Sequence, residues 1–164
     1  DQILHSSDIG PGNCLLDATM RNFNLGKFDK DGLLASMGQV DNALLKKLLG
    51  QIDFLSYPRA DDISVYINLI EKNKRSLMKK TPEDILCTLT ELTVQKIREY
   101  FNFCGAPAQV IFHGGGIENK YLMERITETI KTEITTIDRL ITSKYVEAAA
   151  FAYLAFKEKE VLFK

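Results

Sequence analysis

The chain has 164 residues and a net charge of −1, which suits one domain with a substantial core and supplies no field that would collect nucleic acid or an anionic membrane surface. Its apolar content of 45% is ordinary for a globular protein, no apolar run approaches the ~20 residues needed to span a bilayer, and no signal-peptide pattern opens the chain. Because the three cysteines are odd in number and form no CxxC pair, they favour reduced thiols in a cytoplasmic protein over a disulfide framework or a zinc site.

Helical periodicity dominates the first half of the chain. A loop with two glycines, DIGPGN, leads into a predicted helix over residues 15–23. FDKDGLLASMGQV then predicts a loop with a short helix closed by Gly38, and DNALLKKLLG predicts a helix capped by Asp41 and stopped by Gly50. A connection rich in breakers, FLSYPRADD, precedes the helix SVYINLIEKNKRSLMKK, whose basic end is typical of a solvated face.

The second half predicts an α/β arrangement. Thr81 and Pro82 in TPEDILCTL suit the cap and first turn of a long helix with one apolar face. AQVIFHGGG predicts a strand ended by three glycines, and a helix follows with Leu122 and Ile126 on one face. EITTIDRLI contains a second strand, and VEAAAFAYLAFK predicts a final, largely buried helix. This order indicates an α/β fold with some parallel pairing.

The loop DIGPGN is the first candidate site. Gly10 and Gly12 flank Pro11 just before a helix, and a helix N-terminus beyond a glycine loop presents unpaired N–H groups that suit phosphate. Asp8 would be repelled by phosphate, but it could hold Mg²⁺ through water or act as a general base beside a transferring phosphoryl group. A tight turn with Asp8 as a helix cap is the alternative, and spacing leaves both open.

The loop FHGGGIEN is the second candidate site. Gly114, Gly115 and Gly116 leave room for a flat or bulky ligand beyond the end of a strand, where open α/β sheets bind ligands. The alternative is a strand-to-helix turn in which Asn119 caps the following helix. A single run of three glycines does not decide between the two interpretations.

Three further titratable residues need an interpretation. Glu147 lies in the first turn of the last predicted helix, where it either compensates the helix dipole or serves as an active-site carboxylate. His5 and His113 have no acid or cysteine at ligand spacing, so structural roles are favoured for both. No metal ligand is predicted among the side chains.

The order of these features resembles the anhydro-N-acetylmuramic acid kinases, bacterial enzymes of the actin-like sugar-kinase superfamily. The matching stretches are DIGPGNCLLDA, DKDGLLASMGQVDNALLKKLL, LTELTVQKI, HGGGIENKYLM and EAAAFAYLAF. The resemblance implies that residues 1–164 form the C-terminal lobe of an actin-like ATPase (RNase H-like) fold, an α/β lobe that is helix-rich with a small mixed sheet. The N-terminal lobe would lie outside this chain.

The resemblance also implies roles for individual residues. Asp8 stands in the position of the catalytic base, and Glu147 matches an acid that helps to position the attacking water. The residues that would contact the nucleotide, in the second phosphate loop and the adenosine motif, are Gly10, Gly12, Asn13, Gly114, Gly115 and Gly116.

The reaction implied by the resemblance uses ATP, Mg²⁺ and water. Water attacks the anomeric carbon of 1,6-anhydro-N-acetylmuramic acid while O6 takes the γ-phosphoryl group, which gives N-acetylmuramic acid 6-phosphate and ADP in cell-wall recycling. The partners implied are this sugar, the N-terminal lobe on the same or a separate chain, and a second copy in a homodimer.

Two of the departures from the family pattern bear on function. The first phosphate loop, of the type GTMSGTSxDG, has no match in this sequence. Half of a cleft should not align the reacting groups, and a misplacement of ~1 Å can lower the rate ~100-fold. Little or no kinase activity is therefore expected of this chain alone. The segment YPRADDISVYIN stands where the family tends to carry a Pro-rich stretch followed by KSTGRE. Arg59 keeps a positive charge there, whereas Asp61 and Asp62 add negative charge. No role is assigned to this segment.

Two other functions therefore stay open. The chain could be a non-catalytic remnant that persists as a folded or dimerising module, an interpretation favoured by the altered RADDIS segment and the missing lobe. It could also derive from an actin-like kinase for a different sugar, because the absent lobe carries much of the sugar specificity.

Overall fold

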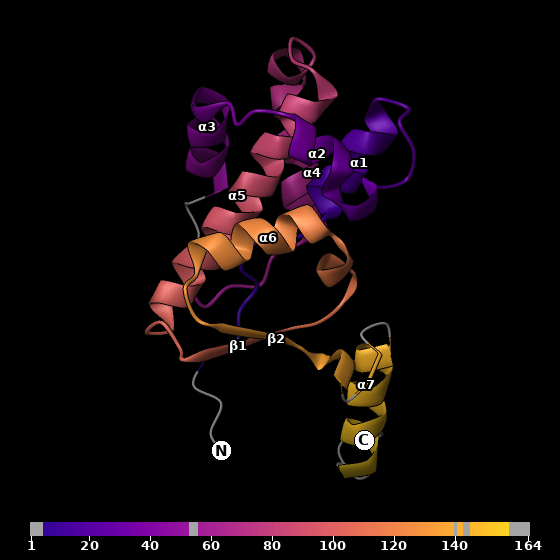
Figure 1. The fold of residues 1–164 in the computed structure, drawn as a ribbon, viewed down its shortest axis with the longest axis vertical. Coiled ribbons are helices and arrows are strands. Elements are labelled where there is room, and N and C mark those ends of the chain that lie inside the picture. Colours follow the sequence, from indigo (N-terminus) through magenta and orange to yellow (C-terminus); the bar gives the residue numbers. More distant parts are fainter. Residues whose placement is uncertain (1–4, 53–55, 140, 143–144, 158–164) are drawn as a thin grey trace.

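The computed structural model describes residues 5–52, 56–139, 141–142 and 145–157. Within these ranges the chain forms an α/β fold in which a small sheet packs on one side of a body of helices (Figure 1). The α-helices are α1 (Cys14–Asn22), α2 (Leu33–Met37), α3 (Asn42–Ile52), α4 (Ile63–Leu77), α5 (Pro82–Phe103), α6 (Lys120–Thr129) and α7 (Val146–Lys157). The strands are β1 (Gln109–Phe112) and β2 (Glu133–Thr136), and the short 3-10 helices are η1 (Lys30–Gly32), η2 (Gly115–Glu118) and η3 (Ile137–Arg139).

Helix α5 is the centre of the fold. It begins as predicted, because the Thr81 side chain accepts a hydrogen bond from the Asp84 N–H and Pro82 occupies the first turn. It packs against α1, α2, α3 and α6 (Figure 1). Leu89 and Leu92 are fully buried at this centre. Among the described helices, none is both long and apolar enough to cross a membrane.

The sheet is a two-stranded parallel unit in the described residues. Gln109 of β1 is paired with Glu133 of β2, and the register runs to Phe112 opposite Thr136. Helix α6 connects the two strands, and such a crossover joins parallel strands, so the expected small mixed sheet is replaced by a purely parallel one here. Val110 packs with α5 and α6 residues on one face, whereas Ile111 on the other face is 56% exposed.

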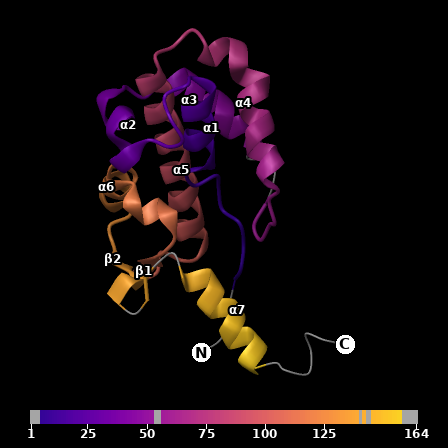
Figure 2. The same ribbon diagram turned by 90° about the vertical axis from the view of Figure 1, so that its right-hand side faces the viewer.

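Two sequence predictions about helices are wrong. Helix α3 continues past Gly50 to Ile52, because the helix tolerates glycine and nothing in the surroundings forces a turn there. The last helix is not largely buried: Phe151 is 73% exposed and Phe156 is 69% exposed. Figures 1 and 2 both show α7 projecting beyond the sheet, away from the helical body, so its apolar side chains face solvent.

Candidate functional site

The first glycine loop is a turn fastened to α5. Gly12 has a φ of +53°, a conformation that favours glycine, and the Cys14 N–H donates to the Pro11 carbonyl at 3.0 Å. The Thr93 hydroxyl of α5 donates to the Gly12 carbonyl at 3.1 Å. These contacts fix the backbone immediately before the N-terminus of α1.

Gly10 is required for a different reason, which is close approach to α5. A Cβ at Gly10 would lie 3.1 Å from the Cβ of Lys96, so that a larger residue would force this neighbour to move by a few tenths of an ångström. The Lys96 side chain is 1% exposed, its ammonium pairs with Glu99, and it lies 5.7 Å from the centre of the Tyr57 ring. The methylene chain of buried Lys96 therefore packs against the first glycine loop at Gly10.

Asp8 does not cap α1, so the alternative interpretation of this residue is wrong. Its N–H donates to the Arg59 carbonyl at 2.9 Å, and its Oδ2 accepts the Asp61 N–H at 2.7 Å. Asn13 occupies the N-cap position of α1 and makes no side-chain capping bond. The Asp8 carboxylate is exposed at the protein surface, where it can reach a ligand.

The second glycine loop is the predicted strand-to-helix turn. Gly114 has a φ of +83°, η2 follows, and the Asn119 side chain caps α6 by accepting the Leu122 N–H at 3.1 Å. A Cβ at Gly115 or Gly116 would meet no atom within 4 Å. The turn therefore both caps a helix and leaves open space beyond the end of β1, so the two interpretations are compatible.

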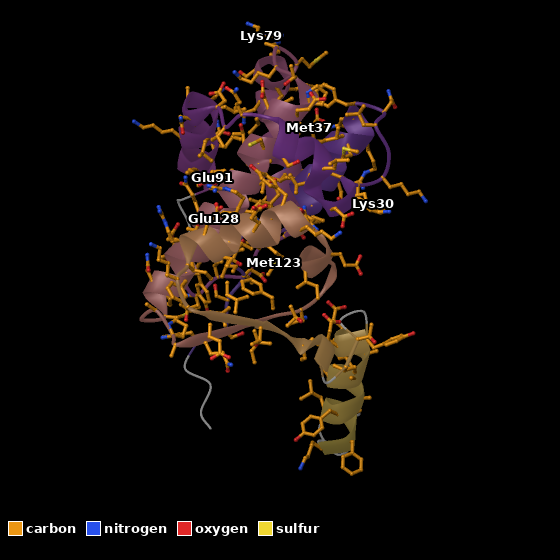
Figure 3. All side chains as sticks on the ribbon, viewed as in Figure 1. Lys30, Met37, Lys79, Glu91, Met123 and Glu128 are labelled. Carbon is orange, nitrogen blue, oxygen red and sulfur yellow. The ribbon has the colours of Figure 1, made fainter. Side chains whose placement is uncertain are left out.

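The two glycine loops meet at one cleft of about 560 Å³. Asn13 of the first loop and Gly115 and Gly116 of the second line it, and the Asn119 amide donates to the Asn13 Oδ1 at 3.4 Å. Residues Phe28–Asp31 form another wall; Lys30, labelled in Figure 3, is exposed and extends outward from the helical body.

The sequence did not predict the wall formed by Phe28–Asp31, because FDKDG indicated only a loop before a short helix. Asp29 is buried and accepts the N–H groups of Leu34 at 3.0 Å and Ala35 at 2.9 Å, so it caps α2. Gly32 has a φ of +71°, and a Cβ there would lie 2.3 Å from the Asn119 Oδ1. The signals in the sequence for this close packing were Asp29, an acid shortly before a helix, and Gly32.

The cleft is acidic. Asp17, Asp29, Asp31 and Glu118 line it together with one lysine, Lys30. Burial raises the pKa of the Asp17 carboxyl above its ordinary value, and Arg21 opposes that rise. Nucleotide phosphates alone would be repelled by these carboxylates, whereas a divalent cation bound to the phosphates would reduce the repulsion.

The structure brings together only part of the predicted site. Asn13, Gly115 and Gly116 line the cleft, whereas the other predicted site residues, Asp8, Gly10, Gly12, Gly114 and Glu147, do not. Glu147 lies in the first turn of α7, as predicted, and is exposed on the projecting helix. In the described residues no group of three or more His, Cys, Asp or Glu side chains is arranged to hold a metal ion.

None of the histidines or cysteines lines the cleft. The His5 ring lies 5.0 Å from the Phe103 ring, and His113 borders an apolar pocket beside β1. Cys14, Cys87 and Cys104 are all free thiols, as expected. Burial, with a contribution from Asp17, raises the pKa of the Cys14 thiol, which makes it a poor nucleophile.

Comparison with known proteins gives one consistent family. The family profile described as anhydro-N-acetylmuramic acid kinase matches residues 1–162. Proteins named anhydro-N-acetylmuramic acid kinase are 38% identical in Pseudomonas savastanoi pv. phaseolicola and 37% identical in Pasteurella multocida. The alignments cover 94% and 92% of this chain but only 44% and 41% of the two relatives. The chain thus spans less than half the length of these curated relatives.

Proposed function

The chain belongs to the anhydro-N-acetylmuramic acid kinase family, and from that premise we propose that it supplies one half of the active site of an ATP-dependent sugar kinase. The substrate proposed is 1,6-anhydro-N-acetylmuramic acid and the product is N-acetylmuramic acid 6-phosphate. The observation that carries the proposal is the shared cleft, because residues of both glycine loops, 102 positions apart between Asn13 and Gly115, line the same space.

The nucleotide is assigned to this cleft. The open backbone at Gly115 and Gly116 would lie against adenosine, because no side chain fills the space above it. Asn13 and the N-terminus of α1 would face the phosphates, since the first N–H groups of a helix favour anions. Mg²⁺ would neutralise charge on the phosphates during transfer; it is usually held by phosphate oxygens, water and one or two carboxylates, and Asp17 is a cleft carboxylate of that kind.

Asp8 is assigned as the general base. In the proposed reaction Asp8 accepts a proton from water, and the water oxygen forms a bond to the anomeric carbon as the bond from that carbon to O6 breaks. O6 takes the γ-phosphoryl group, and ADP leaves. The exposed carboxylate and its hydrogen bond to the Asp61 backbone suit this role, because a base must be both accessible and held in place.

The chain alone is proposed to be incomplete as an enzyme. Glu147, the second proposed catalytic acid, lies on α7 away from the cleft, and the relatives are more than twice as long as the matched region. An N-terminal lobe, on the same or a separate chain, would complete the cleft and position the sugar. A homodimer is also proposed, from the family resemblance.

Binding of MgATP to the 164-residue chain tests the nucleotide site. We expect calorimetric titration to show binding that Gly115→Val weakens at least ~10-fold, because the added side chain has space to project into the cleft without disturbing the fold. Gly50→Ala, at an open position outside the cleft, is the control and should bind as the parent does. Binding that is unaffected by Gly115→Val would show that the nucleotide does not bind in this cleft.

Activity is tested in the polypeptide as it occurs in its source cells. Its length, from intact mass after capture with an antibody to this segment, shows whether a second lobe is attached. With that polypeptide, or with a co-purifying N-terminal partner, we expect ATP-dependent phosphorylation of the anhydro sugar that is lost in Asp8→Asn. A folded dimer without nucleotide affinity or activity would favour the non-catalytic module instead.

A further inference from the structure

We propose that Arg59, Asp61 and Tyr66 form a positioning unit that orients the Asp8 carboxylate, with Oδ2 engaged and Oδ1 left for the substrate water. The catalytic meaning of this unit rests on the proposed role of Asp8 as base, whereas its geometry does not. Like Asp8, the three residues do not line the cleft, and Arg59 and Asp61 contact Asp8 and its backbone neighbours.

The backbone on both sides of Asp8 is fastened to the segment that precedes α4. The Asp8 N–H donates to the Arg59 carbonyl at 2.9 Å, and the Arg59 N–H donates to the Ser7 hydroxyl at 2.9 Å. The Arg59 guanidinium reaches past Asp8 and donates to the Ile9 carbonyl at 3.2 Å. Figure 2 shows the chain entering α4 beside the N-terminal segment. Asp8 therefore sits on a short length of backbone held before and after it.

The carboxylate of Asp8 is held by a backbone donor, not by a side chain. The Asp61 N–H donates to Oδ2 at 2.7 Å, and no other donor within the described part of the chain reaches the carboxylate. A single amide donor fixes the rotation of the carboxylate without neutralising it, which leaves the second oxygen as a proton acceptor. A catalytic base needs this kind of preset orientation.

The direction of the Asp61 N–H is set by a buried polar cluster. The Asp61 and Arg59 side chains are 3% and 4% exposed, and the Arg59 Nε lies 3.1 Å from the Asp61 Oδ2. The Tyr66 hydroxyl, on α4, donates to the same oxygen and accepts from the Arg59 guanidinium at 3.3 Å. Because a buried carboxylate cannot easily lose its partners, the turn from Arg59 to Asp61 has one preferred conformation.

The titration of Tyr66 agrees with this arrangement. Burial, together with the hydrogen bond to Asp61, raises the pKa of the Tyr66 phenol above its ordinary value. The phenol therefore stays protonated, and remains a donor to Asp61, across the range in which a kinase would work. Arg59 and Asp61 belong to the segment RADD, where the sequence departs from the family pattern, and Tyr66 follows on α4.

Amide NMR of the ¹⁵N-labelled 164-residue chain tests the geometry without any need for activity. We expect the Asp61 amide proton to shift with pH as the Asp8 carboxylate titrates, and this transition to disappear in Asp8→Asn. In Tyr66→Phe we expect the Asp61 and Asp8 amides to exchange at least ~10-fold faster. Asp62→Asn is the matched control, because Asp62 caps α4 through the Ser64 N–H and an asparagine can still cap.

Two NMR results would overturn the proposal. One is an Asp61 amide whose pH dependence is the same in the parent and in Asp8→Asn. The other is exchange at Asp61 and Asp8 that is as slow in Tyr66→Phe as in the parent, because the cluster would then not hold the turn. Tyr66→Phe leaves the buried Arg59–Asp61 pair intact, so the variant is expected to fold.

Kinetics of the active polypeptide provide the second readout. Tyr66→Phe and Arg59→Lys are expected to lower kcat at least ~10-fold with the KM for ATP unchanged, whereas Asp62→Asn should leave both constants unchanged. An increase in the KM for ATP with kcat intact would contradict a positioning role. If no form of the polypeptide is a kinase while the amide results hold, the proposed function fails and the positioning geometry stands.

Discussion

Helix α7 is more apolar than α5, yet it is α5 that is buried and α7 that is exposed. Leu89 and Leu92 of α5 are fully buried, whereas Phe151 and Phe156 of α7 are exposed over more than two thirds of their surface. Helix α5 is surrounded by α1, α2, α3 and α6, and α7 projects beyond the sheet (Figure 1). Apolar side chains favour burial, but they become buried only where another surface of the molecule packs against them.

The same contrast divides the candidate site. Thr93 and Lys96 of α5 hold the first glycine loop, so that half of the site is built within the chain. Glu147 lies in the first turn of α7, where it is exposed. We infer that the part of the site carried by α7 needs a further surface to hold it in place.

Hydrogen exchange should give the largest difference between the two helices. Amides at the centre of α5 are expected to exchange only through global unfolding, whereas a 12-residue helix without packing is marginal on its own. We therefore expect α7 amides to exchange at least ~1000-fold faster than those around Leu92, a ratio that follows from a global stability of ~5 kcal/mol or more. Comparable protection in α7, measured by NMR or mass spectrometry, would break the comparison.

Truncating a leucine to alanine should cost more stability in α5 than in α7. Leu92→Ala is expected to reduce the free energy of unfolding by ~2–5 kcal/mol, because it leaves a cavity in the packed centre of α5. Leu154→Ala makes the same chemical change on α7, where the side chain is 47% exposed, and should cost under ~1 kcal/mol. Denaturant unfolding of both variants gives the comparison, and equal costs would show that α7 is packed in solution.

Replacing a glycine by alanine should lower the stability where the glycine packs against α5 and raise it where the surroundings are open. A Cβ at Gly38 would lie 2.1 Å from the Glu83 carbonyl oxygen in the first turn of α5, so Gly38→Ala is expected to destabilise the chain by ~1–3 kcal/mol. Gly50 lies inside α3 with open space around it, so Gly50→Ala should stabilise by ~0.5–1 kcal/mol. Thermal or denaturant unfolding checks both signs; stabilisation by Gly38→Ala would show that the two segments are not in contact.

A surface ion pair beside the start of α5 should give the smallest effect. Lys80 holds the pKa of the Asp41 carboxyl below its ordinary value, helped by the Leu44 N–H that Asp41 caps. A carboxyl whose folded pKa is lowered adds stability above its unfolded pKa of ~4, and this stability is lost as the pH falls through the folded pKa.

Asp41→Asn keeps a capping oxygen and removes only the charge. It is expected to cost ~0.5 kcal/mol at pH 7, and the cost should shrink as the pH falls below ~4. Denaturant unfolding at a series of pH values measures this. A cost that is independent of pH from 7 down to 3 would mean that the charge of Asp41 contributes nothing.

Local structure was predictable from the sequence wherever its cause is local. Thr81 and Asn119 cap the helices that they were predicted to begin, because a capping side chain bonds an N–H two or three residues away. The two glycine loops and both strands also lie where the sequence placed them. The family prediction is confirmed, since motifs in a fixed order are carried by the sequence itself.

What the sequence by itself determined was thus the order of elements, their starting points and the family. Only the tertiary structure decided that Asp8 bonds the Asp61 backbone instead of capping α1, because the two residues are 53 positions apart. It also decided that Asp29 forms a wall of the cleft and that α7 is exposed. The physical reason is the same in each case: periodicity and capping record contacts within a few residues, whereas burial and site assembly depend on which distant surfaces meet.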